Sequence, residues 1–237
     1  MIPLKDDNPT STFPYVTVAL IALNTMVFIY QSSLGQGMLG PIKLGQVKLD
    51  LFILKAGAIP YEITRLRDII PENFLPPPLS LFTAMFVHGG FMHLGGNMLY
   101  LWIFGDNIED RLGHLKFLIF YLSTGVVASL THVVIHPDSA IPMIGASGAV
   151  AGILGAYFLL FPRAHVKTLI IVFFFIRVVS IPAVIFLGIW FAFQVLSTAA
   201  GGGIAWYAHI GGFVAGTAVV WSAVGGGKGR KRGRRGR

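Results

Sequence analysis

Long apolar runs separated by short polar or charged segments dominate the hydrophobic pattern of this chain. A helix needs about 20 mostly apolar residues to cross the hydrocarbon core of a bilayer. Six runs approach or reach that length once their flanks are counted: roughly 15–34, 88–108, 115–135, 144–161, 180–196 and 204–224. Another apolar stretch, 169–176, is too short to cross and is followed by Arg177. The pattern therefore predicts an all-α polytopic membrane protein with six transmembrane helices.

The segments outside these runs divide the chain into three parts. We expect a short N-terminal segment at 1–14, a six-span domain at 15–224 and a basic tail at 225–237. The first connection, 35–81, mixes basic and acidic residues and includes three consecutive prolines. It contains amphipathic pieces but no spanning run, so it is expected to form an ordered loop at the membrane interface.

Composition supports a membrane protein and excludes cysteine chemistry. Of the 237 residues, 54% are hydrophobic and only 12% are charged, which is too apolar for an ordinary soluble domain. The chain has no cysteine, which excludes disulfides, thiolate metal sites and a cysteine nucleophile.

The net charge of +8 is concentrated in the tail, where 228–237 carries seven Lys and Arg residues and no acid. A basic cluster directly after a transmembrane helix fixes the topology and lies near anionic lipid, so we expect no nucleic-acid partner. With six spans, both termini share the cytoplasmic side of this tail. Arg163 and Lys167 then also lie on the cytoplasmic side, and the loop 35–81 lies outside. The prediction is a multi-pass protein of a prokaryotic plasma membrane with both termini cytoplasmic.

Small residues mark one side of two predicted helices. Gly148 and Gly152, just after Ser147, are four residues apart. Gly212 and Gly216 in the last run have the same spacing. Such pairs let helices approach closely in lipid. Ser147 lies on the first turn of its helix, where backbone N–H groups are unpaired and negative charge is favoured. It can be read as a nucleophile or as a serine that bonds a carbonyl one turn back.

Four polar residues fall at one depth in the predicted bundle. His93, Asn97, Ser147 and His209 lie in spans that run from outside to inside, each within about two turns of the outer end. A serine and a histidine at one depth suggest a nucleophile and its general base. No carboxylate is placed to orient the histidine, so the sequence predicts a dyad. Asn97 and His93 lie one turn apart and could donate to an oxyanion, together with the Ser147 N–H.

Each of these residues also has a simpler interpretation. Asn97 alone is compatible with a hydrogen bond between helices, and His209 alone with a proton carrier or a core histidine. His88 and His93 lack the spacing of a zinc-binding histidine pair, and no acidic residue lies nearby in sequence. We therefore expect neither a metal ion nor another cofactor.

Four motifs occur in order along the chain: His88-Gly-Gly-Phe-Met-His93-Leu-Gly-Gly-Asn97-Met, Phe104-Gly-Asp-Asn-Ile-Glu109-Asp-Arg111-Leu-Gly113, Gly145-Ala-Ser147-Gly148 and Ala208-His209-Ile-Gly-Gly212-Phe-Val-Ala-Gly216. Together they resemble the rhomboid family of intramembrane serine proteases, over about 13–221 and in the family's order and spacing. The resemblance implies a rhomboid-like bundle of six helices with a long external first loop. One departure is that the Trp-Arg pair of the first loop in many members is absent here.

The resemblance also implies roles for individual residues in a protease that cleaves transmembrane segments of other membrane proteins. Ser147 would be the nucleophile and His209 the base, with His93 and Asn97 in the oxyanion hole. Supporting roles would fall to His88, Gly145, Gly148, Glu109, Arg111, Gly212 and Gly216. The outer end of the fifth span, which carries Trp190 and Phe193, and the loop 197–203 would form a substrate gate and its cap.

Two other functions are compatible with parts of this pattern. A catalytically inactive rhomboid-like protein would bind membrane clients, but it would be expected to lack the serine or the histidine. A small transporter could use His209 and His93 as proton carriers, but it would need polar residues through the full membrane depth. The inner halves of the second, fourth and sixth spans are almost wholly apolar.

Overall fold

The fold is mostly helical. The computed structural model describes residues 1–35, 42–69, 75–172, 174–198 and 205–232. The α-helices in these ranges are α1 Tyr15–Gly35, α2 Ile42–Ala56, α3 Pro60–Arg65, α4 Ser80–Thr83, α5 Phe91–Leu112, α6 His114–Ile135, α7 Ser147–Leu160, α8 Ala183–Ser197 and α9 Trp206–Arg232. Short 3-10 turns, Pro77–Leu79 and Ala84–Phe86, flank α4.

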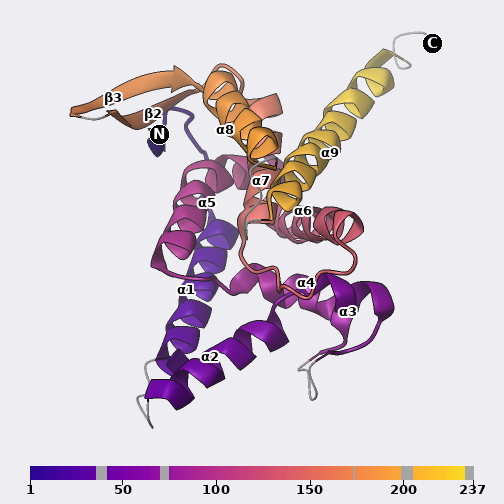
Figure 1. The fold of residues 1–237 in the computed structure, drawn as a ribbon. Helices are drawn as coiled ribbons and strands as arrows, with labels where there is room; N and C mark the ends of the chain where they lie inside the picture. Colours follow the sequence, from indigo (N-terminus) through magenta and orange to yellow (C-terminus); the bar gives the residue numbers. More distant parts are fainter. Residues whose placement is uncertain (36–41, 70–74, 173, 199–204, 233–237) are drawn as a thin grey trace.

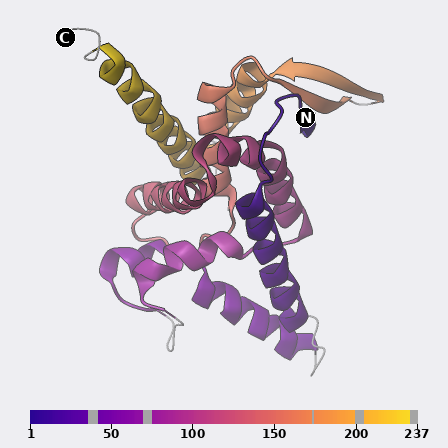
Figure 2. The ribbon, with the colours of Figure 1, turned by 180° about the vertical axis from the view of Figure 1, so that it is seen from behind.

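The elements define two opposite ends of the molecule (Figure 1). We call one the loop end, because it contains α2, α3 and α4 from the first connection. The other, the sheet end, contains three strands: β1 Ile2–Asp6, β2 His165–Val172 and β3 Phe175–Pro182. Helices α1 and α5 pack side by side between the two ends, as the view from behind also shows (Figure 2).

Two described helices, α1 and α6, are long and apolar enough to cross a membrane by length and composition. Three further apolar helical segments are shorter, namely Pro77–Phe86, α7 and α8. The predicted spans at 15–34 and 115–135 therefore correspond to α1 and α6, whereas the total of six spans stays a prediction.

The helix boundaries correct the sequence prediction in three places. Helix α5 begins only at Phe91, so His88 precedes it, because two glycines follow His88 and glycine is a poor helix former. Helix α8 begins at Ala183 and not at Ser180, because the residues before it belong to β3. Helix α9 continues to Arg232, beyond the expected start of the tail. The cap loop predicted at 197–203 lies mostly outside the described residues.

The prediction of an all-α protein was wrong at the sheet end. Strands β1, β2 and β3 form one antiparallel sheet in that order, and β2 pairs with β3 from His165–Pro182 to Val172–Phe175. The apolar stretch 169–176, which is too short to cross a membrane, therefore lies within a hairpin. Four of its eight residues are β-branched and three are phenylalanines, and both types favour a strand over a helix.

Asp6 fastens this sheet to the helices. Its carboxylate accepts a hydrogen bond from the Tyr157 hydroxyl of α7 at 2.5 Å and one from the Asn107 side chain of α5 at 3.1 Å. Burial raises the pKa of Asp6 above its ordinary value. The first strand is thus anchored to residues of two helices that lie 101 and 151 positions later in the chain.

Glycines bring α7 very close to its neighbours. A Cβ added to Gly152 would lie 2.5 Å from Thr124 Oγ1 on α6. On the other side, a Cβ on Gly212 would lie 2.2 Å from the Gly148 carbonyl oxygen, and one on Gly216 would lie 1.9 Å from the Gly152 carbonyl oxygen. At Gly212 and Gly216, no other residue fits without moving α9 away from α7.

Glu109 caps the start of α1 from the end of α5. One carboxylate oxygen accepts the Val16 N–H at 2.9 Å, and the other accepts the N–H and hydroxyl of Thr17 at 2.8 and 2.7 Å. These N–H groups belong to the first turn of α1 and have no partner within their own helix. His114 Nδ1 also lies 2.6 Å from the carboxylate, and the Glu109 side chain is fully buried.

We expect Glu109→Gln to lower the free energy of unfolding by about 1–3 kcal/mol, because an amide nitrogen would replace one acceptor of a buried hydrogen-bond set. Unfolding of the detergent-solubilised protein, followed by circular dichroism, measures the change. Asp110→Asn is the matched control, because Asp110 accepts hydrogen bonds from Ser11 and Thr12 at an exposed site. Equal losses in the two variants would contradict a special role for the buried cap.

Candidate active site

Ser147 is the first residue of α7, and the chain before it is held from the loop end. The N–H and carbonyl of Met143 pair with those of Ala58 at 2.9 and 3.0 Å, and the Gly145 N–H donates to the Ala84 carbonyl at 2.8 Å. Gly145 has a φ of +115°, a conformation that favours glycine. The backbone therefore enters the helix at Ser147 along a fixed path.

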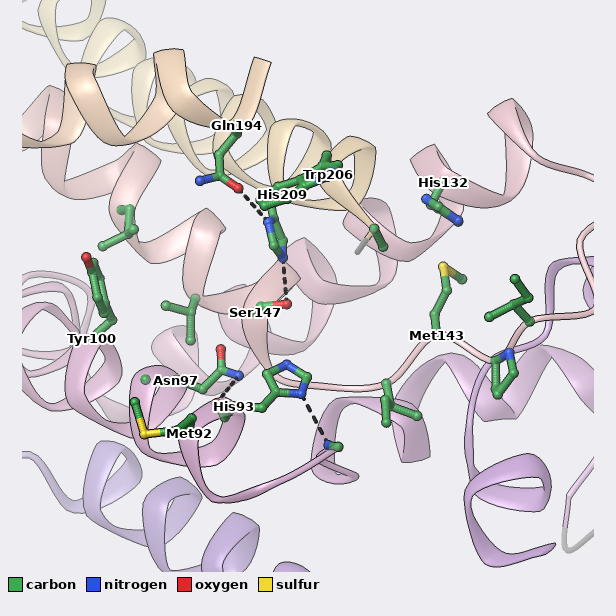
Figure 3. Close-up of a pocket in the computed structure, with 18 of the residues that line it drawn as sticks. Met92, His93, Asn97, Tyr100, His132, Met143, Ser147, Gln194, Trp206 and His209 are labelled. Carbon is green, nitrogen blue, oxygen red and sulfur yellow. Dashed lines mark hydrogen bonds between the residues drawn. The ribbon is translucent and has the colours of Figure 1, made fainter. Parts of the chain in front are cut away.

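His209 lies one turn into α9 and faces Ser147 (Figure 3). Its Nε2 is 2.8 Å from the Ser147 Oγ. Gly212 packs closely on the carbonyl of Gly148. Gly148 is the residue after Ser147, and Gly212 comes three residues after His209. The approach of the two helix backbones thus brings the two side chains within hydrogen-bonding distance.

A third polar residue, Gln194 of α8, completes a chain with His209 and Ser147. Its Oε1 lies 2.7 Å from His209 Nδ1, and its side chain is buried. The sequence interpretation did not assign this residue. The available signal was that a lone amide inside an apolar membrane helix is costly and usually functional.

Asn97 and His93 line the same cavity as Ser147 and His209. In the described geometry, Asn97 Nδ2 donates to the His93 carbonyl at 2.9 Å, and His93 Nδ1 accepts the Gly89 N–H at 3.2 Å. An amide has two N–H donors, so Asn97 keeps one for another acceptor. The cavity has a volume of about 870 Å³.

His88 contacts the residue that precedes Ser147. Its ring is fully buried, and its Nε2 accepts the Ala146 N–H at 3.4 Å. The side chain of Gln31 hydrogen-bonds both the carbonyl and the N–H of His88. His88 is therefore placed to hold the start of α7 and does not line the cavity with the other predicted residues.

Of the remaining predicted residues, Trp190 also lines the cavity, whereas Phe193, Glu109 and Arg111 do not. Glu109 and Arg111 are at the sheet end of α5, where Arg111 is exposed. Trp190 is half-buried, with its ring 6.3 Å from that of His209, whereas Phe193 is 60% exposed and meets the edge of Trp206.

The cavity lining is neutral or basic. Among the described lining residues there is no aspartate or glutamate, and the further titratable side chains are His132, His136 and Tyr100. The described residues also contain no group of three or more His, Asp or Glu side chains arranged to hold a metal ion. The site therefore combines a serine, several histidines and two amide side chains with apolar residues.

Comparison with known proteins gives this geometry a family context. Residues 78–225 match the Rhomboid domain. Rhomboid protein 1, mitochondrial, of Saccharomyces cerevisiae is 33% identical over 165 residues, which are 65% of this chain and 44% of that protein. Rhomboid protease GluP of Bacillus subtilis is 33% identical over 138 residues, 57% of this chain and 24% of the relative. Rhomboid-like protein 11, chloroplastic, of Arabidopsis thaliana is 32% identical over 93 residues, 39% of this chain and 33% of the relative. The chain thus spans less than half the length of each of these three relatives.

We expect Gly145→Ala to reduce the reactivity of Ser147 toward a fluorophosphonate at least about tenfold. The added Cβ would lie 2.7 Å from the His93 ring, at a φ that costs a side chain roughly 1–3 kcal/mol. Gly95→Ala is the control, since a Cβ there meets nothing within 4 Å. Labelling rates of purified variants test this, and a Gly145→Ala rate equal to that of Gly95→Ala would show that the turn before Ser147 tolerates a side chain.

Proposed function

The chain belongs to the rhomboid family of integral membrane proteins, and on this premise we propose that it is an intramembrane serine endopeptidase that cleaves transmembrane segments of other membrane proteins. The observation that carries the proposal is the 2.8 Å contact between His209 Nε2 and Ser147 Oγ. The similarity to a relative named as a rhomboid protease, GluP of Bacillus subtilis, supports it further.

In the proposed reaction, Ser147 Oγ attacks the peptide carbonyl while His209 Nε2 accepts the hydroxyl proton. His209 then returns that proton to the leaving amine, and water releases the acyl group by the same steps. The developing oxyanion would be stabilised by the Ser147 N–H at the positive end of α7, by the second Asn97 N–H and by His93. Because these donors belong to α5 and α7, they would cost little to arrange during the reaction.

The proposed topology has six spans with the sheet end in the cytoplasm. The long external loop is then the region of α2, α3 and α4 at the loop end. Residues 1–14 and the tail 225–237 both lie inside, the tail near anionic lipid, and 15–224 form the protease domain. A prokaryotic plasma membrane remains our proposed location; the similar relatives include bacterial, mitochondrial and chloroplast proteins.

Substrate entry would require movement of the C-terminal half of α8. We call it the loop-end half, because the N-terminal half follows β3 at the sheet end. The sheet-end half is anchored, because Ala183, Phe186 and Leu187 are buried and the Phe186 ring lies 6.4 Å from that of Tyr100. The loop-end half carries the exposed Phe193 and packs through large side chains, which separate more easily than close backbone contacts.

Ser147→Ala and His209→Ala should each lower cleavage of a reporter transmembrane substrate by about 10⁴-fold or more, without unfolding the protein. The double variant should lose no more than either single variant, because the two residues act as one unit. Ser139→Ala and His132→Ala change the same residue types in the same cavity and serve as controls. Cleavage that persists in Ser147→Ala, or its absence in the wild type, would favour the inactive client-binding alternative or another nucleophile.

Trimming Trp190 or Phe193 to Ala should raise cleavage of a helical substrate severalfold, because it loosens the loop-end half of α8. Ile185→Ala is the matched control, since Ile185 lies on the anchored half of the same helix and is similarly exposed. The cysteine-free chain also permits a cysteine pair that ties α8 to α5. Undiminished cleavage with that crosslink complete would rule out the gate.

A further inference from the structure

We propose, on the basis of the function above, that Gln194 is a positioning residue that fixes the tautomer and orientation of His209 from the gate helix α8. The proposal starts from the 2.7 Å contact between Gln194 Oε1 and His209 Nδ1, on the opposite side of the ring from Ser147. The three side chains come from α8, α9 and α7 and form one continuous line (Figure 3).

The hydrogen bonds of Gln194 determine which end of its amide faces the histidine. Gln194 Nε2 donates to the Trp190 carbonyl one turn earlier, at 3.3 Å. Oε1 therefore faces His209, and an amide oxygen can only accept. His209 must carry its proton on Nδ1, which leaves the Nε2 lone pair free for the Ser147 hydroxyl. The reversed amide would favour a proton on Nε2, and the ring could not act as the base.

The surroundings of His209 provide no ionic substitute for Gln194. The Trp190 and Trp206 rings lie 6.3 and 5.9 Å from the imidazole. The titratable side chains that line the cavity around it are His93 and Tyr100 of α5, His132 of α6 and His136 just after it. No described lining residue is a carboxylate, so a neutral amide takes the place that an aspartate has in a catalytic triad.

Three Gln194 variants test the proposal through the rate and pH dependence of fluorophosphonate labelling at Ser147. Gln194→Leu and Gln194→Met remove the acceptor and should lower the labelling rate about tenfold, as expected for one lost hydrogen bond to the base. Gln194→Glu keeps an acceptor and adds a negative charge that favours imidazolium. The midpoint of its rate–pH profile should therefore move upward by about one to three pH units, while the rate at high pH stays near that of the wild type.

A residue that only packs α8 would not produce this pattern. Wild-type rates in both apolar variants, or an unchanged midpoint in Gln194→Glu, would overturn the proposal while Ser147 labelling still supports the protease. Absence of labelling in the wild type would overturn both. Histidine ¹⁵N NMR of the wild type gives a test that does not depend on variant folding. The Nδ1–H tautomer of His209 is expected, and an Nε2–H tautomer would refute the inference.

Discussion

The contact between the backbones of α7 and α9 is the constraint on which the rest of the site depends. Gly212 and Gly216 lie directly over the carbonyl oxygens of Gly148 and Gly152, where an added Cβ would clash at about 2 Å. In lipid, helices gain little by burying apolar side chains against each other, so close van der Waals packing must hold them. The same contact places Ser147 and His209 at a distance set by the helix backbones and not by flexible side chains.

The other elements complete this arrangement from the two ends of the molecule. At the loop end, Ala58, Ala84 and His88 each hold one residue of the segment that leads into Ser147. At the sheet end, Asp6 and Glu109 fasten the N-terminal strand and α1 to α5 and α7. Both carboxylates are buried and accept more than one hydrogen bond. Each therefore joins segments that are far apart in the sequence.

The sequence predicted those features that depend on one segment at a time. Helices α1 and α6 could be predicted because each is a long, uniformly apolar run, and Ser147, Asn97 and His209 because polar residues are rare in such runs. The sheet could not, since β2 and β3 are short apolar segments interrupted by Lys167 and Arg177, and their partner β1 lies over 150 residues away. Gln194 was missed for a similar reason. Its contact with His209 depends on how α8 is rotated and how it packs on α9. The spacing of residues within α8 predicts neither.

If the proposed gate is correct, the position of Gln194 on α8 creates a conflict between substrate entry and base activation. In that mechanism a substrate helix would reach Ser147 from the lipid only after the loop-end half of α8 moves, and that half carries Gln194. A displacement of about 1 Å would stretch the 2.7 Å contact between Gln194 Oε1 and His209 Nδ1 beyond hydrogen-bonding distance. The open state would therefore admit substrate while its base lacks a fixed tautomer. Chemistry would begin only after α8 packs back around the bound segment, so segments that prevent α8 from returning would bind without being cleaved.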